Sequence, residues 1–426
     1  MQQLIGLGGV AVILGIGWSL SVARRSIPWR TVAVGVALQF AFAFLFLRFP
    51  PLVAAFDGLA AVVTRVISFA DEGVRFVFGG LADASGAWGF VFAVRVLPVI
   101  VFFAAVMSVL YHLGVMQRVV AGVAWAIRRS MGVTGVEALS AAANIFVGQT
   151  EAPLTVKPFI PRMTRSQLNA VMASGFATIA GSVMAGYVAM VGGEDEAMRV
   201  EVAKHIMAAS MMSAPAGIVM AKLMVPETEV PPDETPDALR ALPRTTVNVM
   251  DAAAEGAVDG LRLALNVGAM LVAFVALIAL LNWPLAALSE AGPVAAWRES
   301  LGIPVLTFQN ILGMALRPLA WLVGGGAESA NLAALMGTQV VATEFVAYAD
   351  LATMVQSGSI GRREAAIATY ALCGFANFPS IAIQIGGLGA MAPERRGDLA
   401  RLGLRAMVAG ALACWMTGAV AGIFLG

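Results

Sequence analysis

The feature that most limits what this chain can fold into is a series of long apolar runs that carry almost no charge. A helix needs about 20 consecutive apolar residues to cross the hydrocarbon core of a bilayer. Runs of that length recur along the whole sequence, and we predict eight transmembrane helices from them. Their ranges are 3–22, 31–48, 88–114, 166–193, 205–225, 262–283, 365–392 and 404–425.

The composition supports this prediction and excludes several classes of protein. Only 12% of the residues are charged and 59% are hydrophobic, whereas a soluble protein carries roughly 25% charged residues. So little charge cannot cover a water-facing surface, which excludes cytosolic enzymes, secreted disulfide scaffolds and disordered chains. The net charge of +1 offers no field for a polyanion, so we expect no nucleic acid partner. No nucleophile–base or metal-ligand pattern stands out, and we expect no enzymatic activity.

The positions of the arginines and lysines predict the orientation, because these residues concentrate in cytoplasmic loops. They follow the first and third predicted spans, precede the fourth, and fill the loop between the last two. All these loops lie on one side if both termini are on the outer face. The acidic segment 194–196 then also lies outside, and the proline-rich segment 226–260 becomes a cytoplasmic linker. Arg362 and Arg363 depart from this pattern.

Three further stretches are apolar but interrupted by polar residues: 50–80, 138–163 and 301–357. Charged residues are scattered through the first of them, which is typical of helices that lie at the membrane interface. The other two follow one pattern. Each places a Thr-Glu pair in an otherwise apolar segment, and each is followed by a span interrupted by Gly-Phe-Ala and then Thr or Asn. The pairs are Thr150-Glu151 and Thr343-Glu344, and the interruptions begin at Gly175 and Gly374.

The predicted topology indicates how these two segments run. Residues 138–163 lie between spans that end and begin inside, so they must enter the membrane and return on that face. Residues around 327–357 must do the same from the outer face. We therefore predict two opposed re-entrant helical hairpins that belong to inverted repeats, an arrangement typical of secondary transporters whose substrates bind where the repeats meet. Irregular backbone at membrane depth must be surrounded by protein or line a cavity.

The polar residues in these segments are candidates for binding, because an ionisable side chain at membrane depth is costly and usually functional. Glu151 and Glu344 can accept hydrogen bonds from a polar solute. Gln149 and Asn377 offer both donors and acceptors, although either could simply join two helices. For Thr178 two readings stay open: its hydroxyl bonds the preceding turn of its own helix, or a helix break there frees carbonyl groups for a cation.

Around these positions the sequence closely resembles the concentrative nucleoside transporters in their bacterial form. The resemblance covers almost the whole chain. Its most specific parts are the segments 92–98, 141–153, 344–348, 373–377, 380–383 and 393–398.

The chain departs from that family's pattern at four positions. Gln339 and Thr343 stand where the second hairpin usually has Lys and Asn, while Pro379 and Thr178 stand where serine is usual. The first two put the local network of that hairpin in question. Pro379 removes a backbone donor, which a broken helix tolerates.

The resemblance implies a homotrimer in a bacterial inner membrane, surrounded by lipid, that imports nucleosides such as uridine by symport with sodium. It assigns the nucleobase to the first hairpin and the ribose to the second, and it needs no cofactor beyond the coupling ion. The implied nucleoside-binding residues are Gln149, Thr150, Glu151, Val183, Glu344, Phe375, Asn377 and Ser380.

A sodium ion would lie between the first hairpin and the fourth span, bound by Asn144, Val147, Thr178 and Ile179. The two apolar residues would contribute backbone carbonyls, and a set of oxygen ligands suits a hard cation. Because the amide at 144 and a hydroxyl at 178 are both present, we favour sodium coupling. The alternatives are a proton-coupled symporter of the same fold and a membrane protein that binds its ligand without transporting it.

These assignments divide the chain into five parts. Residues 1–115 and 261–300 form a scaffold of transmembrane and interfacial helices. Residues 116–225 and 301–426 form two transport repeats, each with a hairpin, a broken helix and a further span. Residues 226–260 link them on the cytoplasmic side.

Overall fold

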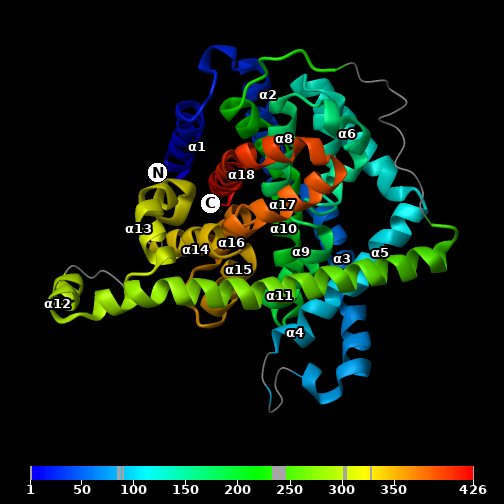
Figure 1. Cartoon of the computed structure of the whole chain (residues 1–426). Coiled ribbons are helices and arrows are strands. Elements are labelled where there is room, and N and C mark those ends of the chain that lie inside the picture. Colours follow the sequence, from blue (N-terminus) through cyan, green and yellow to red (C-terminus); the bar gives the residue numbers. More distant parts are fainter. Residues whose placement is uncertain are drawn as a thin grey trace.

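The computed structural model describes residues 2–83, 88, 91–232, 246–300, 305–326 and 329–425. All regular secondary structure in these ranges is helical, so the prediction of an all-α, multi-pass membrane protein is confirmed. Figure 1 shows one long helix, α11, lying across a bundle formed by the others, with α1 and α18 close together.

Within the described residues, seven helical segments are long and apolar enough to cross a membrane. All but one of these overlap a predicted span, although the first residues of the span 88–114 lie partly outside the described part of the chain. Two predicted spans are absent from this set for physical reasons. The first is a shorter apolar helix, Gln3–Ser19, and residues 365–392 are broken in the middle, so that only Phe378–Met391 is a continuous apolar helix.

The segment predicted to lie at the interface forms a single helix, α3 (Pro50–Phe78), not several. It ends at Gly79, whose φ of 55° suits a residue without a Cβ. Two of its acids pair with basic residues of α10: Asp57 with Lys204 at 2.7 Å and Asp71 with Arg199 at 3.1 Å. Its length and composition would also allow it to span the bilayer, and its interfacial placement stays a prediction.

The helices before the first hairpin are mostly long and apolar, except α6, which has arginines in its last turn. A short 3₁₀ turn, η1, separates α1 from the next helix. Their bounds are α1 Gln2–Ser19, η1 Arg24–Ser26, α2 Trp29–Leu47, η2 Gly79–Ala82, α4 Phe92–Arg95, α5 Leu97–His112 and α6 Val115–Met131.

One order of elements occurs twice in the rest of the chain: a hairpin, a broken helix and a long helix. The first series is α7 (Gly135–Asn144), η3 (Ala152–Arg162), α8 (Arg165–Phe176), α9 (Gly181–Gly192) and α10 (Glu196–Met224). The second is α14 (Ser329–Val341), α15 (Glu344–Gln356), α16 (Arg362–Ala371), α17 (Phe378–Met391) and α18 (Arg396–Phe424), preceded by η6 (Pro393–Arg395). The last helix of each series has 29 residues, so the short sequence repeats belong to a repeat of whole structural units.

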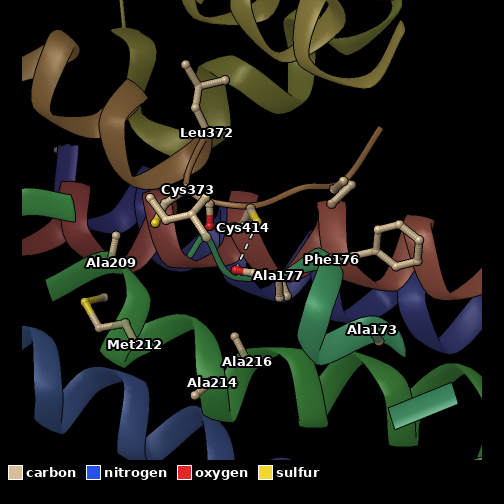
Figure 2. Packing of buried hydrophobic residues seen from close by; sticks show 14 of the residues in the cluster. Ala173, Phe176, Ala177, Ala209, Met212, Ala214, Ala216, Leu372, Cys373 and Cys414 are labelled. Atoms are coloured by element: carbon tan, nitrogen blue, oxygen red, sulfur yellow. Dashed lines mark hydrogen bonds between the residues drawn. The ribbon is translucent and has the colours of Figure 1, made fainter. Parts of the chain in front are cut away.

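The second arm of the first hairpin, η3, is a 3₁₀ helix, because Pro153, Pro158 and Pro161 each lack the N–H that an α-helix requires. The two helix breaks, 177–180 and 372–377, meet at the centre of the bundle. A Cβ on Gly374 would lie 2.5 Å from the Phe176 carbonyl oxygen, so only glycine permits this approach. The thiol of Cys414 in α18 contacts both breaks, donating to the carbonyls of Ala177 and Cys373 at 3.5 Å each (Figure 2).

Helix α11 (Val249–Glu290) is longer than the predicted span 262–283 and begins inside the predicted linker. Charged residues do not end the helix here, which continues through Glu255 and Asp259. Asn248 starts the helix by accepting a hydrogen bond from the Asp251 N–H at 2.9 Å. The helices α12 (Gly292–Ser300), α13 (Phe308–Ala320) and the π-helical turn η4 (Trp321–Gly325) lead from α11 to the second series.

Candidate functional site

A cavity of about 470 Å³ lies where the two hairpins, the two broken helices and α11 meet. Its lining includes every residue that the sequence analysis proposed for substrate binding: Gln149, Thr150, Glu151, Val183, Glu344, Phe375, Asn377 and Ser380. Residues as far apart in the chain as Gln149 and Ser380 are thereby brought to one place. The volume is within the range of small-molecule sites, roughly 300–1,000 Å³.

Glu344 is held in the cavity by two side-chain hydrogen bonds. It is the first residue of α15 and is only 2% exposed. Its Oε1 accepts a hydrogen bond from the Tyr187 hydroxyl at 3.0 Å, and its Oε2 accepts one from the Asn377 Nδ2 at 2.6 Å. The carboxylate is therefore held between the two repeats, with further lone pairs available for a ligand.

The helix ends explain why these side chains point where they do. Asn377 is the N-cap of α17, and its Oδ1 accepts a hydrogen bond from the Ser380 N–H at 2.8 Å. Because this oxygen is used by the cap, the amide nitrogen faces Glu344. Thr343 caps α15 in the same way through Val346. Pro379 lies in the first turn of α17, where a missing N–H costs little.

On the first hairpin, the loop between α7 and η3 supplies Gln149, Thr150 and Glu151. Gln149 is 6% exposed, and its Oε1 accepts a hydrogen bond from the Gln384 Nε2 at 2.9 Å. Glu151 is exposed and also lines a second cavity, of about 310 Å³, between this hairpin, α5 and α11. The two cavities share Gly148, Glu151, Asp259 and Leu263, so they adjoin.

The residues proposed to bind sodium lie beside the tip of the first hairpin. At this point the Phe146 carbonyl accepts a hydrogen bond from the Gly181 N–H at 3.0 Å. Asn144 is fully buried; its Nδ2 donates to the Ser140 carbonyl at 3.0 Å, and its Oδ1 has no partner within the described residues. Thr178 donates its hydroxyl proton to the Ser174 carbonyl at 2.9 Å. Both side chains therefore use their protons on their own helices and keep oxygen lone pairs.

Within the described residues, the backbone beside these side chains also offers carbonyl oxygens that accept no hydrogen bond. In the described part of the chain, no hydrogen bond ends on the carbonyl oxygens of Val147 and Ile179. The two readings of Thr178 consequently hold together: its hydroxyl bonds the preceding turn, and the break beside it leaves a carbonyl unpaired. An unpaired buried oxygen such as the Asn144 Oδ1 needs an explanation, and a bound ion is one. This donor set of oxygen atoms fits a hard cation such as sodium.

Gln339, one of the departures from the family pattern, contributes to the second hairpin and not to the cavity lining. Its side chain is fully buried in α14, and its Nε2 donates to the carbonyls of Leu372 and Gly374 at 3.1 and 2.9 Å. It thus joins the second hairpin to the second helix break.

The sequence analysis missed several residues of the site. Tyr187 and Gln384 lie in apolar helices, and the partners that give them a role are far away in the chain. Helix α11 adds Asp259, Arg262 and Asn266 to the cavity lining. Their spacing of three and four residues places them on one face of the helix, and this polar stripe beside an apolar run was a usable signal.

Comparison with known proteins shows which family the chain is similar to. Three parts of the chain match protein-family descriptions: residues 205–422 the C-terminus of Na⁺-dependent nucleoside transporters, residues 8–81 the N-terminus of the same family, and residues 93–194 a domain described as "Nucleoside recognition".

Individual proteins and solved structures are similar to the chain over almost its whole length. An uncharacterised transporter of Haemophilus influenzae is 47% identical over 100% of this chain and 99% of its own length. Sodium/nucleoside cotransporter 1 of Sus scrofa is 37% identical over 99% of this chain and 64% of its own. Among solved structures, CNTnw in an inward-facing substrate-bound state has a TM-score of 0.87 and 43% identity, covering 100% of this chain and 98% of that one.

Proposed function

Since this chain belongs to the family of Na⁺-dependent nucleoside transporters, we propose that it is a symporter that imports nucleosides, uridine among them, on a sodium gradient. The membership makes the chain a multi-pass transporter and not an enzyme, with sodium as the family's coupling ion. The observation that supports the finer assignment is the cavity between the hairpins, which gathers all eight proposed nucleoside-binding residues.

The chemistry of the lining suits the two halves of a nucleoside. Glu344, held by Tyr187 and Asn377, accepts hydrogen bonds from the ribose hydroxyls, and Ser380 adds a further hydroxyl. At the other end, Gln149, Thr150 and Glu151 face the nucleobase, while Val183 and Phe375 supply apolar contact to its ring. A ligand with a polyhydroxylated end and a flat polar end therefore has complementary groups on both hairpins.

Sodium couples to the nucleoside through the first hairpin. Asn144 and Val147 lie just before the nucleobase-binding loop, and Thr178 and Ile179 lie in the helix break packed against it. An ion held by their oxygens ties the loop to the break and orders Gln149 to Glu151. By linkage, sodium raises nucleoside affinity, and the nucleoside raises sodium affinity by the same factor.

We further propose that both hairpins are re-entrant from opposite faces, that both termini lie on the outer side of a bacterial inner membrane, and that three chains assemble. In this arrangement residues 116–225 and 301–426 form the moving transport repeats, and residues 1–115 and 261–300 form the scaffold. The second cavity, beside Glu255 near the start of α11, provides a path from the site toward the cytoplasmic linker.

The direct test of the site is uridine binding to the purified protein, measured by calorimetry in sodium chloride and in choline chloride. We expect the affinity to rise with sodium, and Asn144→Ala to weaken this dependence. Uridine binding of equal affinity in both salts would contradict the proposed ion site, and no binding in either salt would contradict the substrate.

A further inference from the structure

Gln384 is a buried side chain that has no role in the mechanism described above. It lies on α17 and is 1% exposed. Its Nε2 donates two hydrogen bonds, one to the Met172 carbonyl of α8 at 3.0 Å and one to the Oε1 of Gln149 at 2.9 Å. A residue of the second repeat is thereby bonded directly to the nucleobase-binding loop of the first.

The Met172 carbonyl determines which way both amides point. A backbone carbonyl can only accept hydrogen bonds, so the amide nitrogen of Gln384 must face it. The second proton of that nitrogen points at Gln149, which must therefore offer its oxygen to Gln384. The Nε2 of Gln149 is then left to the cavity, and Gln149 presents a donor there.

The close approach of the two glutamines to α8 depends on a residue without a side chain at position 175. A Cβ on Gly175 would lie 2.8 Å from the Gln384 Nε2 and 3.0 Å from the Gln149 Cβ. Alanine at this position would therefore push one or both glutamine side chains out of the observed arrangement.

We propose that Gln384 is a positioning residue for Gln149, an inference that rests on the proposed function. Through Gln149, Gln384 selects nucleosides according to whether the base presents a carbonyl oxygen or an amino group at that point. A donor at that point favours a base with a carbonyl oxygen over one with an amino group, because two donors facing each other leave a buried polar group unpaired. The site therefore prefers uridine to cytidine, which differ in this way at one position of the same ring.

The test is the ratio of uridine to cytidine affinity, measured by calorimetry on the purified full-length protein in saturating sodium. For the wild type we expect uridine to bind at least about fivefold more tightly, since the low end of the cost of an unpaired buried polar group is about 1 kcal/mol. Gln384→Met removes both donated hydrogen bonds and frees Gln149 to turn, so the ratio should fall to about one. Gln384→Glu keeps the shape; its carboxyl, protonated where it meets the Met172 carbonyl, offers only an acceptor to Gln149, so Gln149 should turn its oxygen to the cavity and the preference should reverse.

Gln339→Met is the matched control, because Gln339 is a buried glutamine that likewise donates to two acceptors but does not touch Gln149. It should change the affinities for uridine and cytidine by the same factor and leave their ratio as in the wild type. A ratio that stays at the wild-type value in both Gln384 variants, or a wild type that prefers cytidine, would overturn the inference. A wild type that binds neither nucleoside would overturn the proposed function as well.

Discussion

Replacing Glu344 with glutamine should weaken the binding of the ribose and leave the binding of the nucleobase unchanged. The substitution keeps the size of the side chain and removes one acceptor oxygen and the charge. Asn377 must still donate to position 344, because its own oxygen caps α17. The oxygen of the new glutamine therefore faces Asn377, and its nitrogen faces Tyr187.

The magnitude follows from the hydrogen bonds that remain. The carboxylate can offer two oxygens to the ribose hydroxyls, whereas the glutamine keeps one neutral oxygen, already shared with Asn377. A hydrogen bond to a charged group contributes roughly 1.5–3 kcal/mol and a neutral one about 0.5–1.5. Two hydroxyls each lose about 1–1.5 kcal/mol, which weakens uridine binding roughly 30- to 140-fold.

Calorimetry with uridine and with 2′,3′-dideoxyuridine separates the ribose contribution from other effects. The dideoxy compound lacks both hydroxyls, so its affinity should be nearly the same in the wild type and in Glu344→Gln. Asp350→Asn is the control, since Asp350 lies on the same helix α15 but is exposed and outside the cavity lining. Unaltered uridine affinity, or equal losses for both ligands, would refute the assigned role.

Three further predictions concern the sodium site, the packing at Gly374 and a buried ion pair. Asn144→Ala should raise the sodium concentration needed for half-maximal uridine binding at least about tenfold, whereas Thr178→Ser keeps its oxygen and should change it little; equal effects would count against the ion site. Gly374→Ala should lower the thermal midpoint, because its Cβ would lie 2.5 Å from a backbone oxygen and such overpacking costs about 1–3 kcal/mol; an unchanged midpoint would be the contrary result. Lys222→Met should cost about 3–5 kcal/mol by leaving Glu137 buried without its partner at 2.5 Å, and adding Glu137→Leu should recover most of that loss; a double variant no more stable than the single one would contradict this reasoning.

Gln149, Glu151, Glu344 and Asn377 stand out in the sequence because they interrupt apolar runs, whereas the other proposed lining residues came from the family resemblance. A Thr-Glu pair or an asparagine in such a run is costly at membrane depth, and the same interruption occurs in both repeats. The order of the elements could be predicted for the same reason, since each span is read from its own composition. These signals come from residues that are close in the sequence, so they can be recognised without knowing how the helices pack.

Tyr187 and Gln384 could not be found in this way. Each lies in a helix whose composition suits packing, and Tyr187 does pack, stacking on Tyr348 with ring centroids 4.2 Å apart. Its bond to Glu344 joins residues 157 positions apart, and no spacing in the sequence indicates which of several buried tyrosines or glutamines reaches the site.

Helix α11 illustrates a different kind of error. The predicted span starts at position 262, because the spans were defined as runs with little or no charge. In the structure the helix extends from Val249 to Glu290, and Asp259 and Arg262 line the cavity. A charge at the margin of an apolar run can therefore end the run or face an aqueous cavity, and only the packing distinguishes the two.

The central claim is that this cavity carries nucleosides across a membrane on a sodium gradient, and the most direct measurement is uridine uptake into proteoliposomes. An inward sodium gradient and an inward proton gradient are imposed separately, each with the other ion equal on both sides. We predict accumulation of uridine above its external concentration with the sodium gradient alone. Accumulation with the proton gradient alone, or uridine binding without accumulation under either gradient, would contradict the account.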